Sequence, residues 1–388
     1  MDEYQNPYRP GAGTSPPALI GRDELIRQFG VALRRARTGR PGKSVMAVGL
    51  RGVGKTVLLN RFAETAERDG FATAFIEATD SGEFATLLAV RLRKILLELD
   101  SGPVSRNVAR ALRVLKSFTL NLPDGSSIQL DPEPLLGEAD SGRLDDDLTD
   151  LLVALGAAAN DRERGVLIAV DEVQYLSEEE LSAAIVAIHR TTQLNLPLVL
   201  VGAGLPQLPG LAGEARSYSE RLFAFPEIGS LDNSDARSAL SIPVEAAGES
   251  YTEAALDELV RESHGYPYFL QEWGYHVWNH ALASPIPAED VIAVRPLVLA
   301  ALDRDFFRVR LDRLTPKERE YLRAMAELGP GPHRSGDIAA RLRVRVESVG
   351  PRRSALIRKG MIYSPAHGDT AFTVPLFDEF LRRVMPAE

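Results

Sequence analysis

The chain has 388 residues, 45% of them apolar and 26% charged, which is typical of a globular protein with two or three domains. It contains no cysteine, which excludes disulfides, thiolate metal sites and cysteine nucleophiles. The net charge of −9 is uneven, because residues 303–388 carry 17 Lys and Arg against 12 Asp and Glu. Residues 334–359 alone carry 8 against 2, which indicates a module that meets a polyanion.

The first residues, MDEYQNPYRP, show no basic region leading into an apolar segment, so we expect no signal peptide. The longest uncharged run, residues 191–213, is broken by three prolines and four glycines, which favours a buried strand and a loop over a membrane span. We therefore expect a cytoplasmic protein without membrane contact.

Residues 1–18 are rich in Pro and Gly and indicate an arm, followed by a lead-in and an amphipathic helix within 19–37. Apolar runs then alternate with helical patterns. The expected strands are 45–49, 71–78, 165–172, 196–203 and 221–228, and the expected helices are 55–68 and 84–99. Continuous apolar strands separated by helices predict an α/β fold with a parallel sheet covered on both faces.

Residues 100–150 interrupt this alternation. We expect a basic helix over 106–116, a hairpin over 116–130 around Pro123-Asp124-Gly125, and then an acidic stretch. Two interpretations are open: a surface insertion, or an element that docks a partner.

Beyond residue 230 the strands stop, and the patterns predict helices, with Thr252 as the N-cap of one of them and further helices over 288–302 and 317–328. The predicted organisation is an N-terminal arm (1–18), a sheet-bearing core (19–230) and two further parts (231–312 and 313–388).

The stretch GLRGVGKT, Gly49 to Thr56, fits the phosphate-loop spacing G-x-x-x-x-G-K-[ST] between an expected strand and an expected helix. Glycines let successive backbone N–H groups face phosphate oxygens, and the following helix adds its N-terminal partial charge. Lys55 would neutralise phosphate oxygens, and the Thr56 hydroxyl would bind Mg²⁺. The predicted nucleotide-binding residues of this segment are Gly49, Gly52, Val53, Gly54, Lys55, Thr56 and Val57.

A phosphate loop also requires a carboxylate at the end of a buried strand, and VLIAVDE (166–172) provides one. Asp171 would hold the hydration shell of the metal, and Glu172 would polarise the attacking water. The alternative is that these acids only end the strand at the surface. No guanine-reading NKxD motif is present, so ATP is favoured over GTP.

The ordered set of motifs resembles the AAA+/STAND group of P-loop ATPases, in particular its archaeal-ATPase and origin-recognition-like branches. The resemblance covers roughly residues 19–300, without the 100–150 insertion. Besides the phosphate loop, it is carried by LIGRDEL (19–25), VDEVQYL (170–176), VLVGAGLP (199–206), RLFAFPEIGSLD (221–232) and HGYPYFLQ (264–271).

The resemblance implies that Ile20, Gly21 and Arg22 lie beside the adenine at the hinge of a helical lid formed by residues 231–312. Gly265-Tyr266-Pro267 resembles the G-x-P element of the lid, which implies a contact of Pro267 with the base; the alternative is an aromatic core turn. His264 either reaches a phosphate or is a satisfied hinge residue.

The resemblance further implies that Arg221 is an arginine finger or a strand-end sensor. Arg216 competes for this role, and a plain surface arginine is the third interpretation. The segment VGAG (201–204) departs from the family pattern, because many AAA+ proteins place a polar sensor there. Slow hydrolysis, as in a switch protein, is therefore expected.

Residues 313–388 resemble a winged-helix domain. We expect helices over 334–342 and 348–360, with Ser348 as N-cap and Gly360 as the stop of the second, then two strands within 361–374 and a last helix over 375–384. Basic residues on or near the outer face would meet DNA phosphates; they are Arg345, Arg352, Arg353, Arg358 and Lys359. The alternative is a solvated basic helix in a module that contacts only protein.

The sequence thus predicts a switch ATPase that uses ATP and Mg²⁺ to control assembly and binding of double-stranded DNA, with a homo-oligomer and a protein client as further partners. The second hypothesis is a STAND-like signalling ATPase whose winged helix makes only protein contacts.

Overall fold

The computed structural model describes residues 1–11, 13–101, 105–120, 133–366 and 368–386. Within them the chain forms two compact units. The α/β unit comprises Asp23–Val48 and Leu58–Glu227, and the helical unit comprises Met1–Arg22, Gly49–Val57 and Ile228–Glu388. Among the described helices, none is long and apolar enough to cross a membrane.

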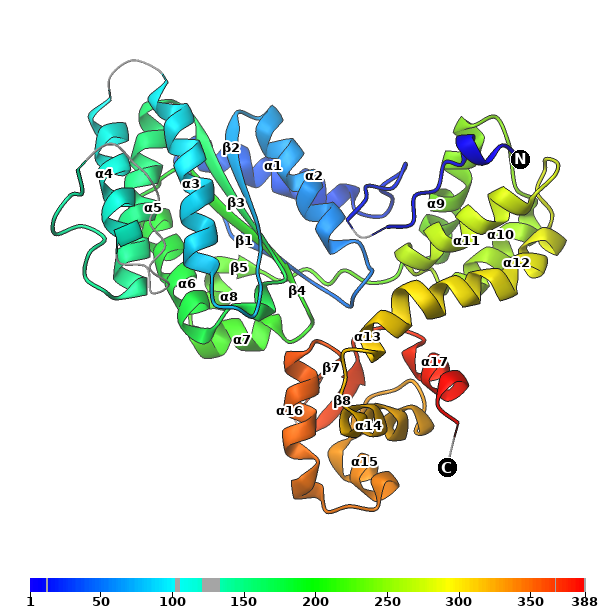
Figure 1. Ribbon diagram of the computed structural model, residues 1–388. Coiled ribbons are helices and arrows are strands. Elements are labelled where there is room, and N and C mark those ends of the chain that lie inside the picture. Colours follow the sequence, from blue (N-terminus) through cyan, green and yellow to red (C-terminus); the bar gives the residue numbers. More distant parts are fainter. Residues whose placement is uncertain (12, 102–104, 121–132, 367, 387–388) are drawn as a thin grey trace. The chain divides into compact units, whose positions relative to one another are not determined.

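The α/β unit is built on a parallel five-stranded sheet in the order β2-β3-β4-β1-β5 (Figure 1). Val48 at the end of β1 pairs with Gly204, and Glu77 at the end of β2 pairs with Asp171. The strands are β1 (Ser44–Val48), β2 (Phe71–Glu77), β3 (Gly165–Asp171), β4 (Leu198–Gly204) and β5 (Phe223–Ala224). The predicted α/β fold is confirmed.

Helices cover both faces of this sheet (Figure 1), which is why every residue of β3 and β4 is buried and their sequences do not alternate. Phe29 and Phe62 stack at 4.1 Å between ring centroids and join α1 to α2. The helices are α1 (Asp23–Arg37), α2 (Lys55–Arg68), α3 (Phe84–Asp100), α4 (Arg106–Leu120), α5 (Leu144–Asp161), α6 (Glu178–Gln193), α7 (Leu208–Ala215) and α8 (Ser219–Leu222), with a 3-10 turn η2 (Val173–Tyr175).

Three expectations for this unit need correction. The hairpin cannot begin at residue 116, because α4 continues to Leu120; residues 121–132 lie outside the described part of the chain. Helix α4 buries Val108, Leu115 and Phe118 in the core that α3, α5 and α6 share, so this part of the insertion is core and not surface. The fifth strand, expected over 221–228, is a strand only over Phe223–Ala224, and Val48 forms a further isolated bridge with Glu227.

The helical unit contains a group of four helices, α9 (Asn233–Ala246), α10 (Glu253–Ser263), α11 (Pro267–His280) and α12 (Ala288–Ala301), followed by a π-helix η3 (Leu302–Arg308) and α13 (Val309–Leu311). Thr252 caps α10 as predicted, because its side chain accepts from Ala255 N at 3.2 Å. The N-terminal arm, with the turn η1 (Glu3–Gln5), is anchored here: Tyr8 is buried and donates to Leu240 O at 2.7 Å.

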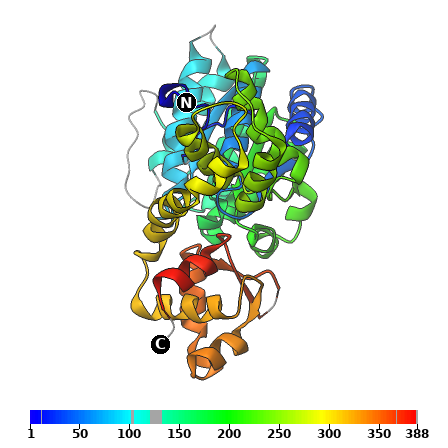
Figure 2. The ribbon, with the colours of Figure 1, turned by 90° about the vertical axis from the view of Figure 1, so that its right-hand side faces the viewer.

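The C-terminal module, residues 316–384, belongs to the same unit. It contains α14 (Pro316–Glu327), β6 (His333–Arg334), α15 (Ser335–Leu342), the turn η4 (Val346–Ser348), α16 (Gly350–Arg358), β7 (Ile362–Tyr363), β8 (Asp369–Phe372) and α17 (Phe377–Val384). An antiparallel sheet in the order β6-β8-β7 and the packing of α17 on α14 hold it together (Figures 1 and 2).

The start of α16 corrects one prediction. Ser348 does not cap this helix, because its hydroxyl donates to Arg345 O at 2.6 Å and closes the preceding turn. Helix α16 begins at Gly350, and the fixed φ of Pro351 suits a first-turn position. Gly360, with φ +64°, follows its end, in agreement with the predicted stop.

Candidate nucleotide site

Three glycines shape the loop Gly49–Thr56, which begins directly after β1. Gly52 and Gly54 have φ values of +85° and +90°, where a side chain would be strained. Gly49 is required for a different reason: a Cβ atom there would lie 2.1 Å from Ile228 O. The motif glycines are therefore needed for backbone conformation and for close approach, as a phosphate cradle demands.

Lys55 is the first residue of α2, and its side chain bends back over the loop. Its Nζ donates to Gly49 O at 2.9 Å and to Leu50 O at 2.8 Å, and the residue is 7% exposed. The ammonium is thus held at the loop backbone. Thr56 follows half-buried, and a Cβ on Gly13 of the arm would be 3.4 Å from Thr56 Cγ2.

The segment at the start of α11 packs against this loop within the helical unit. The Tyr266 hydroxyl donates to Arg51 O, and Tyr268 N donates to Gly52 O at 3.3 Å. A Cβ on Gly52 would lie 3.0 Å from the Tyr266 ring. Burial raises the pKa of Tyr266, so its hydroxyl stays a donor. Pro267 is the first residue of α11, and its contact with a base stays a prediction.

Two arginines that sequence reasoning did not single out lie beside the same segment. Arg51 Nε donates to Gly360 O at 3.2 Å, and Arg51 N donates to Thr373 O at 3.1 Å. Arg310 lies 4.2 Å over the Phe306 ring. Burial lowers the pKa of Arg310 to about 10, and the positive charge of Arg51 makes a smaller contribution in the same direction. Arg51 occupies a variable position of the loop motif, so the motif gives no signal for it.

Residues 20–22 contact the chain that leads into α9. A Cβ on Gly21 would lie 2.4 Å from Asp235 Oδ2, and Arg22 donates to Gly229 O at 2.7 Å. Burial lowers the pKa of Arg22, although Asp235 opposes this shift. Ile20 is half-buried. His264 ends α10 in the left-handed conformation with φ +52°, so its backbone forms the turn towards α11.

Asp171 ends β3, and Glu172 follows with φ +54°. Asp171 is 4% exposed, and its Oδ1 accepts from Glu172 N at 2.8 Å. Gln174 donates from Nε2 to Glu172 Oε2 and accepts at Oε1 from Leu205 N at 3.0 Å. The acids are therefore set among polar groups at the carboxyl end of the sheet. Gln174 belongs to the motif VDEVQYL (170–176), but the sequence alone indicated no role for it.

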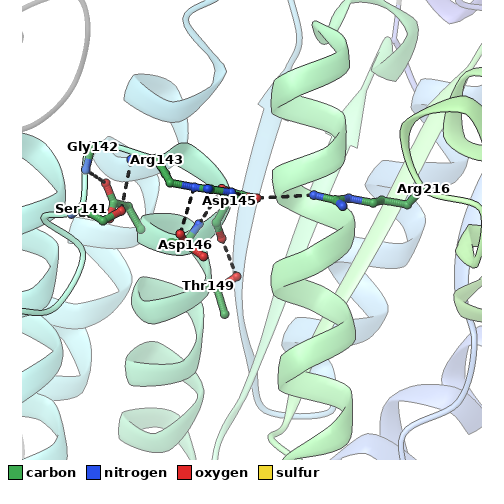
Figure 3. A network of polar contacts seen from close by, with 8 residues as sticks. Ser141, Gly142, Arg143, Asp145, Asp146, Thr149 and Arg216 are labelled. Atoms are coloured by element: carbon green, nitrogen blue, oxygen red, sulfur yellow. Dashed lines mark hydrogen bonds and ion pairs between the residues drawn. The ribbon is translucent and has the colours of Figure 1, made fainter.

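The two candidate finger arginines differ in their surroundings. Arg216 donates to Ser182 Oγ at 2.9 Å and pairs with Asp145 Oδ2 at 3.4 Å, and Asp145 also pairs with Arg143 (Figure 3). Arg221 lies in the short helix α8 and is exposed; within the described residues its side chain has no hydrogen bond or ion pair. Arg216 is thus a structural link to α5, whereas the Arg221 side chain is exposed, and its role as a finger stays a prediction.

The basic residues of the C-terminal module also divide into two groups. Arg353 donates to Thr370 Oγ1 at 2.9 Å, Ser364 Oγ at 2.7 Å and Asp369 O at 3.1 Å, so the expectation that it faces outward is wrong. Lys359 pairs with Glu318 at 2.8 Å. Among the described residues, Arg345, Arg352 and Arg358 have no side-chain hydrogen bond or ion pair; Arg345 and Arg358 are exposed and Arg352 is half-buried.

Comparisons with known proteins agree with this geometry. Residues 18–201 match the family model of the AAA ATPase domain, and residues 304–381 match that of a domain of unknown function, DUF8462. The Walker-type ATPase of Pyrococcus abyssi is similar in structure over 96% of this chain and 98% of its own, with 19% identity and a TM-score of 0.54. No curated protein matches the chain at a significant level.

Two further solved structures are similar with lower scores. The similarity to Cdc6p of Pyrobaculum aerophilum covers 99% of this chain and 97% of the Cdc6p chain, with 15% identity and a TM-score of 0.47. The similarity to a RuvB variant of Thermotoga maritima covers 91% of this chain and 92% of the RuvB chain, with 16% identity and a TM-score of 0.47. The family match over residues 18–201, together with the fold, supports an AAA+ P-loop ATPase.

Proposed function

We propose that this protein is an ATP-binding and hydrolysing switch ATPase that couples its nucleotide state to assembly and to binding of double-stranded DNA. The observation that carries the proposal is the loop Gly49–Thr56, whose glycines adopt the conformations a phosphate cradle needs, within a segment that matches the AAA ATPase domain. The buried Asp171 and the following Glu172 complete the set of groups required for hydrolysis.

Each proposed role follows from a side chain's chemistry. Lys55 neutralises phosphate oxygens, and Glu172 accepts the proton of the attacking water. Mg²⁺ fits the donor set, because the Thr56 hydroxyl and the Asp171 carboxylate are the hard oxygen ligands it prefers, and Asp171 is oriented by Glu172 N. When bound, the ion would neutralise phosphate charge, and Thr56 and Asp171 are the residues that would hold it or its waters.

The proposal for DNA rests on the C-terminal module, whose order of helices and strands is that expected of a winged helix. Of the five predicted DNA contacts, Arg345, Arg352 and Arg358 are available, since Arg353 and Lys359 are bound within the module. These three residues lie within η4–α16 and the turn before it, in the most basic part of an acidic chain. They would contact phosphates and would not by themselves read base sequence.

A second candidate function, a signalling ATPase whose C-terminal module contacts only protein, is favoured by one observation. Arg51 of the phosphate loop is bonded to two backbone carbonyls of that module, those of Gly360 and Thr373. A module bound in this way can report the state of the loop without contacting DNA.

DNA-stimulated ATP turnover tests the proposal against this second candidate. The steady-state ATPase rate is measured with and without duplex DNA at low salt, with Glu172→Gln as the control for contaminating activity. Stimulation together with binding of the duplex supports the DNA-coupled switch. Turnover that DNA does not alter, with no DNA binding, supports the signalling function.

A further inference from the structure

Gln174 spans the gap between the turn after β3 and the end of β4. It lies in η2, where its Nε2 donates to the Glu172 carboxylate and its Oε1 accepts from Leu205 N at 3.0 Å. One planar amide therefore joins the proposed catalytic carboxylate to the backbone of the neighbouring strand's end. Both contacts lie within the α/β unit.

The small residues of β4 make this bridge possible. A Cβ on Gly204 would lie 2.9 Å from Gln174 Oε1, and a Cβ on Gly202 would lie 2.9 Å from Val173 Cγ2. Neither glycine has a positive φ, so each is needed for close approach and not for an unusual backbone conformation; at Gly202 a Cβ would also lie 2.5 Å from Met46 Sδ of β1. The segment VGAG (201–204) has no polar side chain. The polar side chain at the end of β4 is instead that of Gln174, which comes from the turn after β3.

Glu172 lies on a sharp backbone turn, so its carboxylate needs a further contact to hold it in one orientation. Glu172 has φ +54°, a left-handed conformation in which the chain turns sharply after β3. A carboxylate on such a turn acts as a general base only if it is held within hydrogen-bond reach of the proton it accepts. A donor fixed at its other end to a sheet backbone restricts the carboxylate's rotation.

We propose that Gln174 is the positioning residue for Glu172, fixing the orientation of its carboxylate against the end of β4 and supplying the polar group that β4 itself lacks. This inference rests on the proposed ATPase function. Gln174 would affect hydrolysis only by orienting the Glu172 carboxylate towards the attacking water, and it would not need to contact the nucleotide.

Two variants test the inference. In Gln174→Ala the carboxylate loses its restraint, so kcat should fall about 10- to 100-fold while KM and ATP affinity stay within about twofold. Gln174→Glu keeps the shape but places a second carboxylate beside Glu172, so the acidic limb of the pH–kcat profile should move to higher pH by about one unit. Gln193→Ala is the matched control, because Gln193 is a glutamine at the end of α6 whose bonds to Arg190 and His189 lie outside the proposed site.

The outcomes separate the inference from the function it rests on. If wild type hydrolyses ATP and Glu172→Gln does not, but both Gln174 variants keep the wild-type kcat and pH profile, the inference alone is overturned. Equal losses of ATP affinity and rate in Gln174→Ala also overturn it, since they indicate a general structural role. If Gln174→Ala does not fold, the pH profile of Gln174→Glu decides. Wild type that binds no ATP and has no turnover overturns the proposed function together with this inference.

Discussion

The end of β3 and the basic helix α16 are two polar regions that the sequence marks equally clearly, yet the structure treats them differently. At β3, Asp171 and Glu172 lie at the end of a buried strand, where Asp171 accepts from Glu172 N and Gln174 donates to the Glu172 carboxylate. At α16, the Arg353 side chain is hydrogen-bonded to Thr370 of the same module. Lys359, just after the end of α16, is paired with Glu318 of that module. A motif tied to the backbone of a buried strand constrains where its side chains lie, whereas a count of charges does not show which charges remain available.

Glu172→Gln tests the β3 side of this comparison and should have the largest effect. The amide cannot accept the proton of the attacking water, so kcat should fall by about 10²- to 10⁴-fold with ATP affinity retained. Steady-state phosphate release and nucleotide titration measure the two quantities. Glu179→Gln, an exposed change on α6, is the control. Turnover at the wild-type rate in Glu172→Gln would show that the motif is not catalytic.

Lys55→Ala should weaken ATP binding by about 100-fold, because a charge-assisted contact worth about 1.5–3 kcal/mol is lost at the phosphates. Titration with a fluorescent ATP analogue checks this, and Lys94→Ala, which changes an exposed cation on α3, should bind like wild type. Unchanged affinity in Lys55→Ala would mean that the loop serves another purpose.

Arg353→Ala should destabilise the protein by about 1–3 kcal/mol, since Thr370, Ser364 and the Asp369 carbonyl lose a shared donor. Arg358→Ala should change stability by less than about 0.5 kcal/mol, because Arg358 is exposed and unpaired within the described residues. Urea unfolding followed by circular dichroism compares the two. Similar values for both variants would remove the distinction between structural and available cations.

The available cations are tested by changing Arg345, Arg352 and Arg358 together to Ala. Loss of up to three phosphate contacts should flatten the slope of log K against log salt by about 2–3 units, with DNA-free ATP turnover unaltered. Fluorescence anisotropy with duplex DNA over a salt series is the measurement, and Arg334→Ala is a single-charge control outside this set. Equal slopes for the triple variant and wild type would favour the signalling function.

Arg221 is tested last, in mixtures of variants, because an arginine finger acts on the active site of a neighbouring subunit. If it acts on a neighbouring subunit, the rate per subunit rises with protein concentration. Mixing Arg221→Ala with Glu172→Gln should then restore part of the activity, since random mixing leaves about one interface in four with both groups intact. A concentration series and a mixing series of ATPase assays check this. A flat series without recovery would assign Arg221 a role within its own subunit, or none.

The sequence alone determined the α/β class, the limits of α2, the loop glycines and the Thr252 cap. These features depend on local periodicity, backbone conformation or spacing within a few residues, which are properties of the chain itself. It missed α5 and the continuation of α4, because their burial depends on how α3, α4, α5 and α6 pack on one another, which local periodicity does not specify.

Only the tertiary structure decided which polar side chains meet. Gln174 became visible as a bridge from Glu172 to Leu205 N because β3 and β4 are neighbours in the sheet, and Gly204 leaves room for its amide. Arg353 proved structural because β8, which follows it in the chain, folds back to present Thr370 and the Asp369 carbonyl. Long-range pairing sets these contacts, and a residue's type and local pattern do not encode its distant acceptor.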